Sequence, residues 1–457
     1  MSDSTTTSQP ILRYQRERTL DQVPGFGTGL QVNLGPDRHA YVALSPCEMT
    51  VYFDNPEHAL HYDLEGRLLK TAEPNTSLRR GLSHKFLATR KRTSDEGGGI
   101  ERKVIVGAEV DAVVATARAQ LTEVLTHIYR GATDIEFGKP SVHQAVEQLT
   151  PILEKAEHFG VEAAFAHVHR FNEIYGRVAI LPPDQYNALV LQATEGCAYG
   201  SCLYCELYRG LFHQRKTTPE FRDHVREAIA FHGEGLRARR SIFLGEANAL
   251  ALPQETLLEF FDVLNENFVF PPADQETVPA RWWLGSKTQF DGVSSFLDLF
   301  TGRQHTTEDF KALRERGLRR VYIGLESGSE ALLEWLCKPS TPERVHSCVH
   351  ALKQAGIHVG IIVLLGAGGL AFDMVHRKKT AELINELGLG AGDYIYFSPL
   401  VIYRNSRYEE QTRALNVERL TAQQLDEQEQ AIRAGLRFDE QRGRPYLARY
   451  EVDTFVY

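Results

Sequence analysis

Three cysteines crowd onto one short segment of the chain. Cys197, Cys202 and Cys205 follow the pattern Cys-x4-Cys-x2-Cys and make up half of the six cysteines in the 457-residue sequence. Thiolates gathered this closely are typical of a metal or iron–sulfur centre. Three protein ligands, where a structural site uses four, leave one coordination position open for another molecule. The spacing therefore indicates a reactive centre rather than a structural one.

The residues alone leave more than one kind of centre open. A zinc site needs a fourth ligand, and His213, which follows Cys205 by eight residues, is the nearest candidate. A non-catalytic iron–sulfur or zinc-binding protein with a structural or sensing role is the alternative to an enzyme. Cys47, Cys337 and Cys348 lie apart from one another without the spacing of ligands, so they are interpreted as small buried side chains.

Alternating strands and helices are expected from residue 181 onward. Apolar runs predict six strands, and helical spacing of apolar residues predicts the segments between them. The strands are expected at 186–193, 241–244, 282–286, 320–324, 358–365 and 393–398. This alternation implies parallel β/α units, whose ligand sites lie at the carboxyl ends of the strands. Because the cysteine segment follows the first strand, it is expected at the mouth of an incomplete barrel of six units.

The region before the barrel has a different pattern. Short strand-like runs over 26–105 predict a β-rich module, and helical spacing over 106–180 predicts a helical connector. Residues 1–25 are expected to form a flexible tail, the barrel core is expected over 181–410, and a C-terminal helix and extended tail over 411–457. The expected fold class is thus α/β, a partial (β/α)6 barrel preceded by a smaller β-rich and helical N-terminal region.

Composition and charge disfavour several classes of function. A net charge of −9 without a long basic run makes nucleic acid an unlikely partner. The N-terminus lacks the positive and apolar segments of a secretory signal, so a cytoplasmic location is expected. The longest apolar stretch, at 358–372, is short and broken by glycines, which predicts a buried strand and loop rather than a membrane span. No membrane partner is therefore expected.

The cysteine segment resembles the cluster motif of the radical S-adenosylmethionine (radical SAM) enzymes. It reads Gly196-Cys-Ala-Tyr-Gly-Ser-Cys-Leu-Tyr-Cys205, and its four-residue spacer resembles a variant branch with a core like those of Elp3 and coproporphyrinogen oxidase. Three later strand ends continue the resemblance, which covers roughly residues 180–435. They read Phe243-Leu-Gly-Glu-Ala-Asn-Ala-Leu250, Arg319-Arg-Val-Tyr-Ile-Gly-Leu-Glu-Ser-Gly-Ser329 and Gly360-Ile-Ile-Val-Leu-Leu-Gly-Ala-Gly-Gly369.

The resemblance implies two cofactors, a [4Fe-4S] cluster and S-adenosyl-L-methionine (SAM). Cys197, Cys202 and Cys205 would ligate the cluster, whose fourth iron would chelate the amino and carboxylate groups of SAM, and Tyr204 would pack near the adenine. Reductive cleavage of SAM would then give methionine and a 5′-deoxyadenosyl radical that takes a hydrogen atom from the substrate. An external electron donor such as flavodoxin or ferredoxin is implied as a partner.

The resemblance also implies roles for residues at two later strand ends. Gly245 and Glu246 would contact the SAM amino group, since a carboxylate suits an ammonium-like donor, and Asn248 could share this role because the alignment can slip. Glu326 and Ser327 would hydrogen-bond the ribose hydroxyls. The alternative for Glu246 is a turn at the strand end, and for Glu326 and Ser327 a cap on the following helix.

The substrate side is less defined by the sequence. Gly366 belongs to a glycine-rich segment that would let the backbone approach a ligand closely. Tyr394, Tyr396, Tyr403 and Arg404, around the sixth strand, are candidates for lining the substrate side, although alternation along the strand directs some of them into the core. The substrate itself, a small molecule or a peptide, is left unknown.

Overall fold

The computed structural model describes residues 28–54, 57–93, 99–137, 141–273 and 287–457, and these form two compact units. The N-terminal unit comprises the chain up to Ile174 together with Ile229–Arg239 and Thr454–Tyr457. The barrel unit comprises Tyr175–Ala228 and Arg240–Asp453. The tail expected at residues 1–25 and the strand expected at 282–286 lie outside the described residues.

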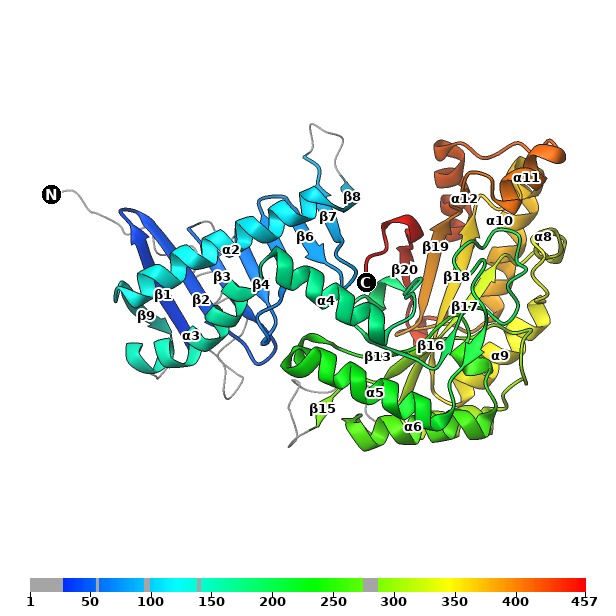
Figure 1. The fold of residues 1–457 in the computed structure, drawn as a ribbon. Helices are drawn as coiled ribbons and strands as arrows, with labels where there is room; N and C mark the ends of the chain where they lie inside the picture. The colour runs from blue at the N-terminus through cyan, green and yellow to red at the C-terminus, as the bar shows by residue number, and fades with distance from the viewer. Residues whose placement is uncertain (1–27, 55–56, 94–98, 138–140, 274–286) are drawn as a thin grey trace. The chain divides into compact units, whose positions relative to one another are not determined.

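An antiparallel sheet forms one layer of the N-terminal unit (Figure 1). Within the described ranges it has nine strands in the order β8-β7-β6-β5-β4-β3-β2-β1-β9, so that all but β9 follow one another as a meander. Leu30, Val32 and Leu34 alternate along the first strand and are buried in the core, as the two-residue period of a half-buried strand requires. The strands are β1 (Thr28–Gly35), β2 (Arg38–Leu44), β3 (Met49–Phe53), β4 (Ala59–Tyr62), β5 (Leu68–Glu73), β6 (Thr76–Arg80), β7 (Phe86–Lys91), β8 (Ile100–Ile105) and β9 (Thr133–Phe137).

Helices α2 (Ala108–Tyr129) and α3 (Val142–His158) share one hydrophobic core with this sheet, and α4 (Val161–Ile174) follows them. Val110, Val114 and Leu121 recur at helical spacing along α2 and are all buried in that core. A capping box starts α3, in which the Ser141 side chain accepts from the Gln144 N–H while the Gln144 side chain accepts from the Ser141 N–H. Sheet and helices therefore stabilise each other in a single unit.

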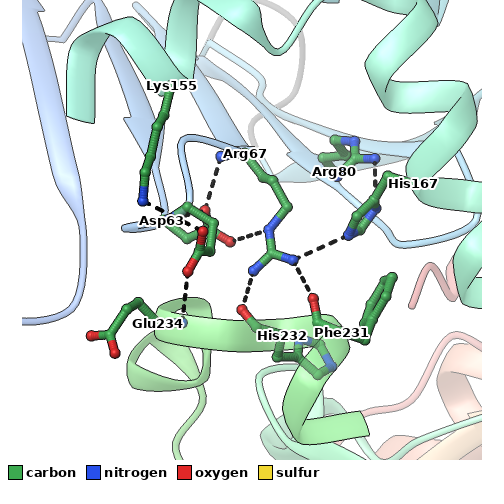
Figure 2. Close-up of polar contacts among 9 residues, drawn as sticks. Asp63, Arg67, Arg80, Lys155, His167, Phe231, His232 and Glu234 are labelled. Carbon is green, nitrogen blue, oxygen red and sulfur yellow. Dashed lines mark hydrogen bonds and ion pairs between the residues drawn. The ribbon is translucent and has the colours of Figure 1, made fainter. Parts of the chain in front are cut away.

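A segment from later in the chain completes the N-terminal unit. It consists of the end of α5 (Thr218–His232) and the 3-10 helix η4 (Gly233–Ala238). Arg67, which precedes β5, donates hydrogen bonds to the carbonyl oxygens of Phe231, at 2.7 Å, and His232 (Figure 2). Its Nε donates to the Asp63 carboxylate at 2.7 Å. One guanidinium thus ties the segment to the turn between two strands.

His167, on α4, lies between two guanidinium groups (Figure 2). Its Nε2 is 3.4 Å from Arg67 Nη1, and its Nδ1 is 3.4 Å from Arg80 Nη2. Burial, together with the positive charges around it, lowers the pKa of His167 to about 2, so the ring is neutral at physiological pH. A neutral imidazole accepts at only one nitrogen, so the two contacts cannot both be hydrogen bonds at once.

The barrel unit is built on a parallel sheet of seven strands within the described residues. The order is β10-β13-β16-β17-β18-β19-β20, and the near-continuous apolar sequences of strands such as β18 fit a sheet covered on both faces. The expected fold class, a partial α/β barrel after a β-rich and helical region, is confirmed. The strands are β10 (Leu189–Gln192), β13 (Ile242–Gly245), β16 (Val293–Phe296), β17 (Leu318–Glu326), β18 (His358–Leu365), β19 (Tyr394–Pro399) and β20 (Tyr446–Arg449).

β16 was not expected as a strand, whereas β20 lies within 411–457, where a helix and an extended tail were expected. β16 occupies the third position, and its sequence Val-Ser-Ser-Phe has two serines in place of an apolar run. Ser295 is fully buried. Its hydroxyl donates a hydrogen bond to the Leu244 carbonyl at 2.7 Å, so the buried polar group is satisfied inside the sheet. β20 comes from the C-terminal segment and adds a parallel strand beside β19.

Helices connect the strands and pack against the sheet, with α7 on β17 and with α9 and α12 on β18. In addition to α5 they are α6 (Gln254–Asn267), α7 (Thr307–Glu315), α8 (Glu330–Trp335), α9 (Pro342–Gln354), α10 (Gly369–Glu386), α11 (Arg407–Ala414) and α12 (Ala422–Gly435). Among the residues that the structure describes, no helix is both long and apolar enough to cross a membrane.

Candidate cofactor site

The cysteine loop leaves the carboxyl end of β10 and is closed at its base by a short antiparallel pair. Thr194 and Glu195 form β11, which pairs with β12 (Gln214–Arg215). Gly196 has a φ of +69°, and a Cβ at this position would come within 2.7 Å of the Phe212 carbonyl oxygen. Only glycine fits both the backbone conformation and the close approach. The loop therefore begins and ends at the mouth of the barrel.

Contacts from two helices hold the loop against the barrel. The Leu203 N–H donates to the Leu336 carbonyl at 2.9 Å, just after α8, and Arg407 on α11 donates to the Cys202 carbonyl at 3.0 Å. Leu203 also packs in a small hydrophobic cluster with Leu336 and Leu364. The backbone between the second and third cysteines is thus fixed by the rest of the unit rather than by the loop alone.

All three thiols of the motif line one cavity of about 230 Å³ inside the barrel unit. Burial raises the pKa of Cys202 to about 12 and also raises that of Cys205, so both thiols are protonated in the protein without a metal. Within the described ranges, no three histidine, cysteine, aspartate or glutamate side chains are already drawn together as metal ligands. The donor set still fits an iron–sulfur cluster, because three soft sulfur ligands converge on one space with no fourth protein ligand among them.

A second polar group, at the end of β17, shares this cavity. The Tyr204 hydroxyl donates to Glu326 Oε1 at 2.8 Å, and Lys338 Nζ donates to the same oxygen at 3.0 Å. Burial by itself lowers the pKa of Lys338, but the Glu326 carboxylate outweighs it and raises that pKa, so the lysine is charged. Glu326 has a φ of +58°, which turns the chain as it leaves the strand. This group places a carboxylate and an ammonium beside the thiols.

The strand-end residues after β13 are buried behind the cavity wall. Glu246 accepts a hydrogen bond from Gln192 Nε2 at 2.9 Å, and its own N–H donates to the Thr194 hydroxyl at 3.2 Å. Burial raises the pKa of Glu246 to about 7. Its neighbour Ala247 lines the cavity, so the backbone of this turn reaches the site even though the Glu246 side chain is not part of the wall.

Several expected site residues lie off the cavity and have partners within the protein. Asn248 accepts from the Asp298 N–H at 2.9 Å. The Ser327 hydroxyl lies 2.8 Å from His376 Nδ1 and accepts from the Ser329 N–H, and Ser329 caps α8. The structure thus brings the three cysteines, Tyr204 and Glu326 to one cavity, and leaves the side chains of the other candidates behind its wall.

Packing explains one of the two glycine candidates, Gly366, but not Gly245. A Cβ on Gly366 would come within 2.7 Å of Leu425 on α12, and the Gly366 N–H donates to the Gln428 side chain at 2.8 Å. Gly245 has no such constraint, since a Cβ there would meet Val190 at an ordinary 3.5 Å. Neither glycine lines the cavity.

The expected tyrosines separate into two groups. Tyr403 lines the cavity, whereas the Tyr396 hydroxyl donates to Asp184 at 2.7 Å in a buried cluster with Arg320. Sequence reasoning did not point to Lys338, which follows Glu326 by twelve residues; a lone lysine before Pro339 carries no ligand signal. Tyr208 and Tyr450, which also line the cavity, were missed because a single tyrosine outside a motif carries no ligand signal either.

The fold and the site together define a class of protein, a parallel β/α barrel with a three-cysteine loop at the carboxyl end of its first strand. Residues 191–384 match the Radical SAM superfamily. This part of the chain, which contains the three cysteines, is therefore a radical SAM domain, and members of that superfamily use SAM and a [4Fe-4S] cluster. No curated protein sequence matches the chain.

Solved structures of radical SAM enzymes are similar at low identity. Coproporphyrinogen III oxidase from Escherichia coli is 15% identical with a TM-score of 0.38, over 54% of this chain and 51% of that one. Elp3 from Methanocaldococcus infernus is 12% identical with a TM-score of 0.36, over 58% and 56%. A radical SAM methyltransferase from Sphaerobacter thermophilus is 15% identical with a TM-score of 0.38, over 60% and 69%. The chain thus spans about half the length of the first two, and the assignment rests on the family match.

Proposed function

We propose that this enzyme cleaves SAM reductively at a [4Fe-4S] cluster held by Cys197, Cys202 and Cys205. The observation that carries the proposal is the single cavity lined by these three thiols, Glu326 and Lys338. When bound, the cluster supplies the electron that splits the sulfonium into methionine and a 5′-deoxyadenosyl radical. That electron comes from an external donor of the flavodoxin or ferredoxin type.

The residues around the thiols then bind and orient SAM. Glu326 accepts hydrogen bonds from the ribose hydroxyls, and the charged Lys338, which donates to Glu326 Oε1 at 3.0 Å, holds the Glu326 carboxylate in place. Tyr204, fixed by its own bond to Glu326, packs near the adenine. Ser327 supports this position from behind through its contacts with Ser329 and His376.

The turn after β13 receives the SAM amino group. The chain reaches the cavity at Ala247, between Glu246 and Asn248. An ammonium group at this turn favours the charged form of Glu246 and so draws its raised pKa back down. Gly245 precedes this turn, and Gly366 shapes the corresponding turn after β18.

Anaerobic reconstitution with iron and sulfide tests the proposal. The wild-type protein is expected to take up about four irons per chain, to lose its charge-transfer absorption on reduction with dithionite, and to form 5′-deoxyadenosine from SAM. Cys202→Ala is expected to lose all three properties. Cys348→Ala is the matched control, because that cysteine lies on α9 and away from the cavity.

Zinc binding without turnover of SAM would instead support the structural or sensing alternative. The fourth zinc ligand suggested by the sequence, His213, is exposed and does not line the cavity.

A further inference from the structure

The segment that follows the third cysteine includes an exposed loop of the barrel unit. Residues 209–215 are all exposed, and they lead to β12, which pairs with β11 at the base of the cysteine loop. Leu207 and Tyr208, at the start of the segment, line the cavity, and the Cys205 sulfur accepts hydrogen bonds from their N–H groups. The exposed loop is thus joined directly to one of the three thiols.

Two adjacent apolar side chains form the tip of this loop. Phe212 is 87% exposed, the highest value among the large hydrophobic side chains of the described residues, and Leu211 is 41% exposed. The tip lies beside the cysteine loop, because a Cβ on Gly196 would come within 2.7 Å of the Phe212 carbonyl oxygen. Gly196 directly precedes Cys197. Apolar side chains that face water within a polar rim are typical of an interaction site.

The acidic side chains next to this tip are already paired with cations. Glu206 is paired with Arg209 at 3.0 Å, and Glu195 is paired with Lys216 at 2.9 Å. Such partly exposed pairs contribute little to stability, but each cancels its own charge. A further cation on this part of the surface therefore adds a net positive charge.

Three more arginines lie around the cavity mouth on the same part of the surface. Arg215 is exposed on β12, and Arg404 is exposed directly after Tyr403, which lines the cavity. Burial and the charge of Asp453 raise the pKa of Tyr403 whereas Arg177 lowers it, so both charges lie near this tyrosine. None of the three arginines forms an ion pair within the described ranges. Even with Asp453 counted against them, this surface is positive, although the whole chain has a net charge of −9.

We propose that Leu211, Phe212 and these arginines form the docking surface for the electron donor, a small acidic protein of the flavodoxin or ferredoxin type. This inference rests on the proposed function, which requires an electron to reach the cluster from outside. One electron passes from the reduced donor to the oxidised cluster, and no bond forms or breaks.

Two physical arguments favour this occupant over a second copy of the chain. The positive rim steers an acidic partner toward the tip, whereas two identical positive rims repel each other. Electron-transfer partners also form small, transient interfaces, which a loop tip can supply, whereas a stable dimer buries a much larger area. The docked donor lies beside Gly196 and hence beside the first thiol of the motif.

Binding of a bacterial flavodoxin and of a plant-type ferredoxin to the reconstituted protein tests the surface, measured by isothermal titration calorimetry. Phe212→Ser is expected to weaken binding about tenfold, because a large apolar side chain no longer contacts the carrier. Arg215→Glu is expected to weaken binding about threefold at low salt and to reduce its salt dependence. Met374→Ser and Lys378→Glu are the matched controls, since both side chains are highly exposed on α10 and outside the loop. The controls are expected to keep the wild-type affinity.

Anaerobic stopped-flow absorbance follows the electron itself. At low carrier concentration, Phe212→Ser is expected to slow reduction of the cluster about tenfold, in proportion to the weaker binding. Reduction by dithionite, a small molecule that needs no docking surface, is expected to keep the wild-type rate.

Four results would overturn the inference. They are a wild-type protein that neither carrier binds, a Phe212→Ser variant that a carrier reduces at the wild-type rate, an equal loss with dithionite, and a wild-type dimer that Phe212→Ser dissociates in sedimentation. The third would mean that the loop acts on the cluster itself, and the fourth would assign the surface to a second copy. A wild-type protein that accepts the electron from a carrier yet forms no 5′-deoxyadenosine would contradict the proposed function instead, so the two failures are distinguishable.

Discussion

Each of the two units buries charged side chains, but they do so with different consequences. In the N-terminal unit, Arg67 is surrounded by protein acceptors, namely the Asp63 carboxylate and two backbone carbonyls (Figure 2). In the barrel unit, Lys338 and Glu326 pair with each other at 3.0 Å but remain at the wall of a cavity. The first group is enclosed by the chain itself, whereas the second faces a space that a ligand can enter.

The difference teaches that buried charge alone does not mark a functional site. His167 has the larger perturbation of its pKa, yet it is packed between two guanidiniums and an aromatic ring, that of Phe231 at 4.5 Å between centroids. The pKa of Lys338 is raised by the Glu326 carboxylate, and this lysine lines the same cavity as the three thiols. Perturbed titration identifies a candidate site only when the group also reaches a cavity.

The largest expected effect is on the stability of the N-terminal unit. Arg67→Met leaves Asp63 buried without its 2.7 Å ion pair and frees the carbonyls of residues 231 and 232. We expect a loss of about 3–5 kcal/mol in the free energy of unfolding, measured by urea titration with circular dichroism. Iron content per folded chain should be unchanged. A loss below about 1 kcal/mol would mean that water replaces the guanidinium and that the group is not enclosed.

A slightly smaller effect concerns pH and Glu246. Because its pKa of about 7 in the folded protein lies above the ordinary 4.5, the folded state holds this proton more tightly than the unfolded chain does. The protonated Glu246 contributes its full stabilisation of the folded state below pH 4.5, and this contribution is lost as the pH rises to about 7. Glu246→Gln should therefore gain about 3 kcal/mol relative to the wild type between those limits, measured by urea unfolding across that range. If the difference in unfolding free energy between Glu246→Gln and the wild type does not change with pH, the substitution acts through packing and not through the proton on Glu246.

Lys338→Met is expected to reduce SAM cleavage about a hundredfold per cluster-loaded chain, because a carboxylate that is no longer held in place misplaces the ribose. The measurement is 5′-deoxyadenosine formation, with kcat and KM determined separately. Lys353→Met is the matched control, since it breaks a comparable pair with the buried Asp393 away from the cavity. Equal losses in the two variants would indicate that Lys338 acts through stability alone.

Much of the barrel could be predicted from the sequence because its strands are buried on both faces. β18 lies at the expected residues 358–365, where an apolar run is continuous. β16 escaped detection, since two of its four residues are serines whose burial depends on bonds such as that from Ser295 to Leu244. Helical periodicity located α2 and α3 but did not reveal that they share a core with the sheet. Which surface a helix packs against depends on the shape and apolar area of that surface, and the helical period of the sequence does not specify it.

The candidate site was predictable to the extent that its residues form local motifs. The spacing of Cys197, Cys202 and Cys205 indicates that they act together as ligands, and all three line one cavity. Lys338 and Tyr450 reach the same cavity from distant segments, through the turn after α8 and through an added strand. Neither belongs to a local pattern, so only the three-dimensional fold brings them to the site.

The smallest expected effect decides how Ser327 contributes. Its hydroxyl contacts His376 Nδ1 at 2.8 Å and accepts from the Ser329 N–H at 3.0 Å, so it already has two partners within the protein. Ser327→Ala should therefore cost about 1 kcal/mol of stability, the net value of a typical hydrogen bond, and should change the affinity for SAM less than twofold. Equilibrium binding of SAM to the reconstituted protein measures the second quantity. A tenfold loss of affinity would mean instead that the hydroxyl leaves His376 and bonds the ribose directly beside Glu326.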